Sequence, residues 1–130
     1  MGWLSRLFGG GGDPDDEPVP DKLLNQDVRR GQLAELESAL ADLVRLMDAP
    51  DAPVDNPGWR GRARDFSYTL GSTRLLLEAK AVTKEGLYEL ISTVRPLYRG
   101  APPPEYAHLA ACNERIVAAL RVLESPAPGE

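Results

Sequence analysis

The sequence contains few of the side chains that bind metals or act as nucleophiles. Among its 130 residues there is one cysteine, Cys112, and one histidine, His108. A single cysteine excludes an intrachain disulfide and is compatible with a reducing compartment. His108 and Cys112 are four positions apart, which can place two ligands on one helix face, but no second pair is present to complete a closed site. We therefore predict no metal, no cofactor and no enzymatic activity.

Long apolar runs and an excess of positive charge are also absent. No run approaches the roughly 20 residues that span a bilayer. The stretch "WLSRLF" at residues 3–8 is too short for a secretory signal and lacks its basic start. The formal net charge of −5 provides no basic field for nucleic acid. We expect a cytoplasmic protein that is at most peripheral to the membrane and binds no nucleic acid.

Strand patterns are lacking too, because no stretch alternates with period two and β-branched residues are sparse. Four segments instead repeat apolar residues at steps of three and four, which is typical of amphipathic helices. The sequence thus predicts an all-α fold, a four-helix up-down bundle, with or without a short extra helix at the N-terminus. The four helical segments are 31–48, 58–82, 84–100 and 104–124.

The chain divides into three parts by composition. Residues 1–21 combine a short amphipathic segment with a linker rich in glycine, aspartate and proline, which favours a flexible chain. Residues 22–124 form the predicted bundle, and one domain is expected for this length. The composition of residues 125–130, "SPAPGE", predicts a disordered tail.

Local signals mark the ends of the predicted helices. Asn56 followed by Pro57 predicts a capped start for the second helix, and Thr83 predicts one for the third. Pro96 is expected to kink or end the third helix. In the first segment, the apolar residues before position 30 do not share the phase of the later leucines. This difference predicts a break or bend near Gly31.

The amphipathic segment at the N-terminus is a candidate docking element. Trp3, Leu4, Leu7 and Phe8 fall at helical spacing, and four glycines follow them. So short a helix is unstable alone in water, because nucleation is not repaid over few residues. We expect it to dock to a protein partner or to a membrane surface, or to pack on its own bundle. Only Arg6 favours anionic lipid, so membrane contact would be weak.

The second helical segment is apolar on two sides. One side carries Trp59, Phe66 and Leu70, and the opposite side carries Tyr68, Leu75, Ala79 and Val82. Two-sided apolarity predicts burial on both sides. The second side is therefore either an interface for self-association or a partner, or the contact of a central helix with neighbours in its own chain.

Polar residues offer two further hypotheses. Asn113 lies at a core position of the fourth segment, where a buried amide needs a partner and can fix register or oligomeric state. Arg60, Arg62 and Arg64 lie in the first two turns of the second segment, where an anion would relieve their repulsion from the helix dipole. This cluster is a candidate anion-binding site, unless nearby aspartates neutralise it within the chain.

These features predict a non-enzymatic adaptor or regulatory protein. It would act through contacts with itself or a partner at the back of the second helix, and its N-terminal segment would dock separately. The alternative is a helical ligand-binding module that holds an anionic small molecule or a phosphorylated or acidic peptide at the arginine cluster.

Overall fold

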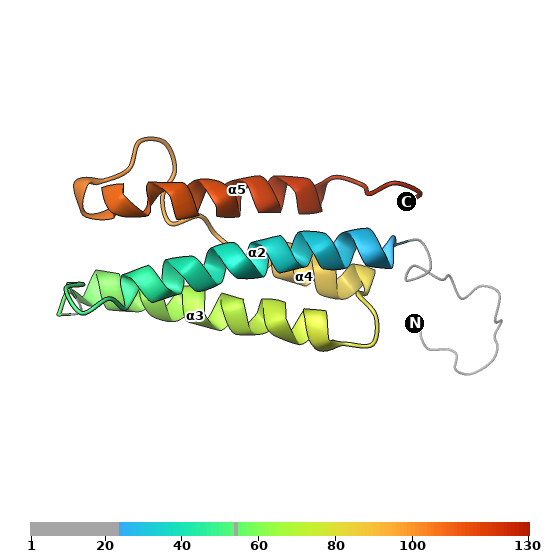
Figure 1. The fold of residues 1–130 in the computed structure, drawn as a ribbon, viewed down its shortest axis with the longest axis horizontal. Helices are drawn as coiled ribbons and strands as arrows, with labels where there is room; N and C mark the ends of the chain where they lie inside the picture. Colours follow the sequence, from blue (N-terminus) through green and yellow to red (C-terminus); the bar gives the residue numbers. More distant parts are fainter. Residues whose placement is uncertain (1–23, 54) are drawn as a thin grey trace.

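The computed structural model describes residues 24–53 and 55–130, and this part of the chain is helical without any strand (Figure 1). Four α-helices pack together, each antiparallel to the one before it, so the predicted four-helix up-down bundle is confirmed. The helix of residues 26–47 packs along those of residues 57–78 and 110–124, and the short helix of residues 84–93 lies behind it in Figure 1. The elements are α2 (Gln26–Met47), α3 (Pro57–Glu78), α4 (Lys84–Thr93), the 3-10 helix η2 (Pro104–Leu109) and α5 (Ala110–Glu124).

The core is built around the inner face of α2, which packs against both α3 and α5. Its apolar residues recur at steps of three and four and therefore share one side of the helix. Full burial of each such side chain contributes roughly 1.5–3 kcal/mol. The fully buried residues of this stripe are Leu33, Leu36, Leu40, Leu43 and Met47.

Helix α2 starts earlier than predicted and continues without interruption through Gly31, so the predicted break at this glycine is wrong. The Asn25 side chain caps the helix by accepting a hydrogen bond from the N–H of Val28. Arg29 lies four positions before Leu33 and continues the buried stripe, with only 4% of its surface exposed. The pattern concealed this continuation because an arginine normally faces solvent.

The predicted helix caps are confirmed. The Asn56 Oδ1 atom accepts hydrogen bonds of 2.8 and 3.3 Å from two N–H groups in the first turn of α3, which begins with Pro57. The Thr83 Oγ1 atom accepts a 2.9 Å bond from the N–H of Gly86 in the first turn of α4. Helix α4 then ends ahead of Pro96, as a residue without an N–H requires.

Helix α3 ends at Glu78, four residues before its predicted end. The backbone at Ala79 is extended, and the following residues form the loop to α4. Val82 lies in this loop and is fully buried. It therefore does not continue the exposed side of the helix, and its place in the predicted interface is wrong.

Residues 125–130 pack against the end of the bundle, in contrast to the predicted disorder. Ala127 is buried, and the carboxylate of Glu130 accepts bonds of 2.9 and 2.6 Å from Nε and Nη2 of Arg29. Arg29 also donates to the backbone oxygens of Leu123 and Ser125. The bonds from Arg29 lower the pKa of Glu130 to about 2. Composition missed this packing because the two partners are 101 positions apart.

Candidate functional site

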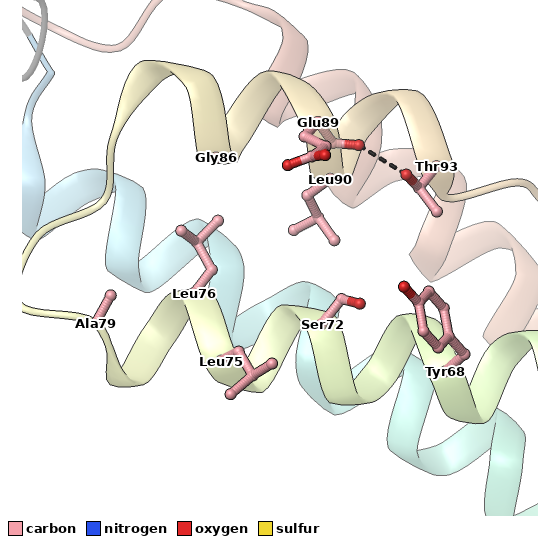
Figure 2. A pocket seen from close by; sticks show the side chains of 9 residues that line it. All are labelled: Tyr68, Ser72, Leu75, Leu76, Ala79, Gly86, Glu89, Leu90 and Thr93. Atoms are coloured by element: carbon pink, nitrogen blue, oxygen red, sulfur yellow. Dashed lines mark hydrogen bonds between the residues drawn. The ribbon is translucent and has the colours of Figure 1, made fainter.

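A groove of about 380 Å³ lies between α3 and α4, and we call it the α3–α4 groove. Leu76 and Leu90 point toward each other across it, and the hydroxyl of Tyr68 points toward α4 (Figure 2). Leu75 projects from the outer side of α3. The lining is mainly apolar and contains a single charged residue. It comprises Tyr68, Ser72, Leu75, Leu76, Ala79, Gly86, Glu89, Leu90 and Thr93.

The groove follows the stretch of α3 that α4 accompanies, because Gly86 and Thr93, from the two ends of α4, both line it. Helix α4 has 10 residues and α3 has 22, so α4 covers only part of the surface of α3. Gly86 allows the first turn of α4 to approach α3, because a Cβ atom there would lie 3.0 Å from Cδ1 of Leu76. Within this stretch, Tyr68 and Leu75 of α3 are exposed to solvent.

Tyr68 and Leu75, two residues of the predicted interface, are the most exposed apolar residues of α3. Each has 70% of its surface accessible. Ala79, the third, is also exposed and lies at the end of the groove. These three residues share the α3–α4 groove, whereas the buried Val82 does not line it. The structure therefore brings together three of the four predicted residues.

The sequence analysis did not identify the exposed tyrosine of α4. Tyr88 is 73% exposed although it is a large aromatic residue. Its position lies off the buried stripe of Leu87, Leu90 and Val94. The sequence signal that could have predicted this exposure is an aromatic residue outside the apolar stripe of its helix. Tyr88 does not line the groove, so it provides a matched exposed tyrosine for comparison with Tyr68.

The three arginines of the predicted anion site do not act as one cluster. Arg62 is half-buried and donates two 2.8 Å bonds from Nη2, to the backbone oxygens of Pro96 and Leu97. Its guanidinium carbon lies 5.5 Å from the ring centre of Phe66. Arg60 and Arg64 are exposed. Arg62 and Arg64 nevertheless line one pocket of about 430 Å³ together with Asp65 and Arg95, whereas Arg60 is not among its lining residues.

Asn113 is buried, as its core position predicted, and it holds the linker after α4. Its Oδ1 atom accepts a 2.7 Å bond from the N–H of Leu97, and its Nδ2 atom donates a 3.3 Å bond to the oxygen of Tyr98. With Arg62 on the other side, the linker is bonded from both α3 and α5. The amide thus satisfies backbone groups that burial would otherwise leave unpaired.

His108 and Cys112 do not form a site with each other. The ring of His108 is exposed and stacks on Trp59, with centroids 6.2 Å apart and planes 9° apart. Cys112 is buried, and burial raises the pKa of its thiol. The part of the chain that the structure describes contains no group of three or more histidine, cysteine, aspartate or glutamate residues placed to hold a metal ion.

The predicted docking residues Trp3, Leu4, Leu7 and Phe8 lie outside the described residues. The described chain begins with Leu24, just ahead of α2. In residues 24–53 and 55–130, no helix has the length and apolar content that crossing a membrane requires.

The fold and its groove define the molecule as an all-α four-helix bundle with a solvent-open apolar groove between two of its helices. Comparisons with protein families, with curated proteins and with solved structures found no match to this chain. The groove is therefore the feature of this molecule from which a function is inferred.

Proposed function

We propose that this protein is a non-enzymatic adaptor or regulatory module that binds an amphipathic helix of a partner protein in the α3–α4 groove. The observation that carries the proposal is the exposure of Tyr68 and Leu75, 70% each, beside the hollow that contains Leu76 and Leu90. Single exposed apolar residues are common on protein surfaces, but an apolar group bordering a groove is typical of an interaction site.

A helix is the occupant that fits the shape of this groove. Two neighbouring helices form a trough, and a third helix can insert apolar side chains spaced at i, i+3, i+4 and i+7. Tyr68, Leu75 and Ala79 offer a row of contacts along α3, and Ser72 between them leaves room for a larger side chain. Glu89 on the opposite side favours a lysine or arginine at the edge of the incoming helix.

The non-enzymatic part of the proposal is supported by the surroundings of the two most reactive residue types. His108 stacks on an aromatic ring, and Cys112 is buried with a raised thiol pKa. A nucleophile requires an adjacent base and an ionised or activated form. Burial and the raised thiol pKa of Cys112 disfavour the thiolate that a cysteine nucleophile requires.

Site-specific photo-crosslinking in the native cells tests the proposal. Tyr68 is replaced by the photoreactive residue benzoyl-phenylalanine, and the matched control carries the same residue at the exposed Tyr88. We expect a discrete adduct with one protein from position 68 and none from position 88. Leu75→Asp should abolish that adduct, since it places a charge beside the groove while Leu75 makes little contribution to the core.

Mass spectrometry identifies the crosslinked segment, and anisotropy then measures binding of the corresponding labelled peptide to the purified full chain. We expect Leu75→Asp to weaken this affinity at least tenfold and Val122→Asp, on an exposed position of α5, to leave it unchanged. Equal adducts from positions 68 and 88, or a crosslinked segment that is not helical in the complex, would contradict the proposal. An adduct with a second copy of this chain would show that the groove mediates self-association and does not bind a different protein.

A further inference from the structure

We infer that the α3–α4 groove is occupied, in the isolated protein, by residues 3–8 of the same chain. The inference rests on the proposed function of the groove and adds its regulation, because a partner helix must displace this segment. The sequence of these residues is "WLSRLF", in which Trp3, Leu4, Leu7 and Phe8 are apolar.

The start of α2 is bonded to the loop between α3 and α4, next to Ala79 at the end of the groove. The side chain of Gln26 makes two hydrogen bonds with the backbone of Val82: its Nε2 donates to the oxygen at 3.0 Å, and its Oε1 accepts from the N–H at 2.8 Å. Arg30, one turn later, donates to the backbone oxygens of Leu77 and Ala79. The chain that precedes α2 therefore enters beside the loop from α3 to α4.

The connecting chain is long enough to return to the groove. The 17 residues from 9 to 25 span at most about 60 Å when extended, and about 20–25 Å on average as a flexible coil. From Ala79 to Tyr68 the groove follows eleven residues of α3, which is about 16 Å of helix. Every part of the groove is thus within reach without stretching the connection.

The chemistry of the segment matches that of the groove. Glu89 is the only charged residue among those that line it, and no described cation forms an ion pair with Glu89. Arg6 is the only charged residue of the segment and lies off its apolar stripe. One apolar stripe and one cation therefore face one apolar trough and one anion.

A second groove provides the comparison. It lies between α2 and α5, measures about 460 Å³, and includes Gly31, Glu35, Arg115 and Val122 in its lining. We call it the α2–α5 groove. Here the acidic residue is already engaged, because Nε of Arg115 lies 3.4 Å from Glu35. Of these two grooves, the α3–α4 groove is the one whose carboxylate has no ion pair with a described cation.

Tethering makes even weak docking sufficient. Short flexible linkers give effective concentrations in the millimolar range. A segment with a Kd of about 1 mM would consequently fill the groove about half of the time. A partner helix that binds more tightly displaces it, so the segment sets an affinity threshold without preventing recognition.

Paramagnetic NMR on the full chain tests this inference. A nitroxide is attached to Ser5→Cys, and wild type treated with the same reagent controls for reaction at the buried Cys112. We expect the amide signals of Gly86 and Thr93 to lose at least half of their intensity at every protein concentration, whereas the signal of Gly31 in the α2–α5 groove is retained. Leu75→Asp in the labelled chain should restore the lost intensity.

Three results would overturn the inference. Broadening only in a mixture of isotope-labelled and spin-labelled chains would assign the segment to a second copy. Broadening at Gly31 would assign it to the α2–α5 groove. An intact Gly86 signal would exclude docking in this groove. If the spin-labelled chain then co-sediments with vesicles of phosphatidylcholine and phosphatidylglycerol, the segment binds a membrane surface instead.

A competition experiment separates this inference from the proposed function. A fluorescein-labelled peptide of residues 1–12 is titrated into wild type and into the full-length double variant Leu7→Ser/Phe8→Ser. We expect the variant, whose groove is vacated, to bind the peptide at least fivefold more tightly than wild type. Equal affinity, or no binding to either, would reject self-occupancy, while the crosslink at Tyr68 would still decide whether a partner uses the groove.

Discussion

The side of the bundle where α2 meets α5 and the side where α3 meets α4 differ in how charged side chains join their helices. On the first side, Arg115 bonds to Asp42 at 2.7 Å and Arg29 bonds to Glu130, so charged side chains connect distant parts of the chain. None of the ion pairs in the described residues joins α3 to α4, and apolar residues border a groove there. Ion pairs therefore help to hold α2 against α5, whereas α3 and α4 are joined without them and leave Tyr68 and Leu75 exposed.

The largest difference in the free energy of unfolding is expected when the same truncation is made at a buried and at an exposed leucine. Leu40→Ala removes a fully buried side chain of α2 and should lower the free energy of unfolding by about 2–5 kcal/mol. Leu75→Ala removes the same atoms from a side chain that is 70% exposed and should change it by at most about 0.5 kcal/mol. Urea denaturation of both variants measures the difference. A similar loss for both would show that Leu75 is covered, and would contradict the open groove.

A smaller effect is expected from the ion pair that fastens residues 125–130. Glu130→Gln should lower the free energy of unfolding by about 1–2 kcal/mol at pH 7, because the ion pair with Arg29 becomes a hydrogen bond to a neutral amide. Arg29 retains its bonds to the oxygens of Leu123 and Ser125. The variant therefore loosens the tail without leaving a guanidinium unpaired.

The pH dependence of this loss has a definite sign. The pKa of Glu130 is lowered to about 2 in the folded protein, from an ordinary value of 4.5. The stability from its ionised form is thus present above pH 4.5 and lost as the pH falls from about 4.5 to about 2. Denaturation of wild type and Glu130→Gln should show a constant difference from pH 5 to 7 that narrows below 4.5. A difference that does not narrow as the pH falls below 4.5 would exclude the ion pair as its source.

The fold was predictable because its information is local. The leucine stripe of α2 and the caps at Asn56 and Thr83 each depend on residues within one or two helical turns. Arg29 was missed although the three-and-four spacing extends back to it, because its burial depends on Glu130, 101 positions away. The break predicted at Gly31 was wrong for the same reason. When Arg29 is counted among the buried positions, the turn before Gly31 is in phase with the leucines.

The candidate site was only partly predictable. Two-sided apolarity of the second segment identified Tyr68 and Leu75, but it could not show that both side chains stay exposed beside α4. The bonds of Arg62 could not be predicted either. Its charge near a helix start suggested an anion, whereas the structure pairs it with backbone oxygens 34 and 35 positions away. Such long-range backbone partners leave no mark in the sequence around the arginine.

The smallest effect is expected from replacing two glycines, one in α3 and one in α4. Gly71 is exposed within α3, and a Cβ atom there would meet nothing within 4 Å. Gly71→Ala should raise the free energy of unfolding by about 0.5–1 kcal/mol, because alanine favours helix. At Gly86 a Cβ atom would lie 2.9 Å from Oγ1 of Thr83 and 3.0 Å from Cδ1 of Leu76. Thr83 and Leu76 would have to shift, and the cap at Thr83 would weaken. Gly86→Ala should therefore give no gain in urea denaturation, and an equal gain for both variants would mean that α3 and α4 are not in close contact at this point.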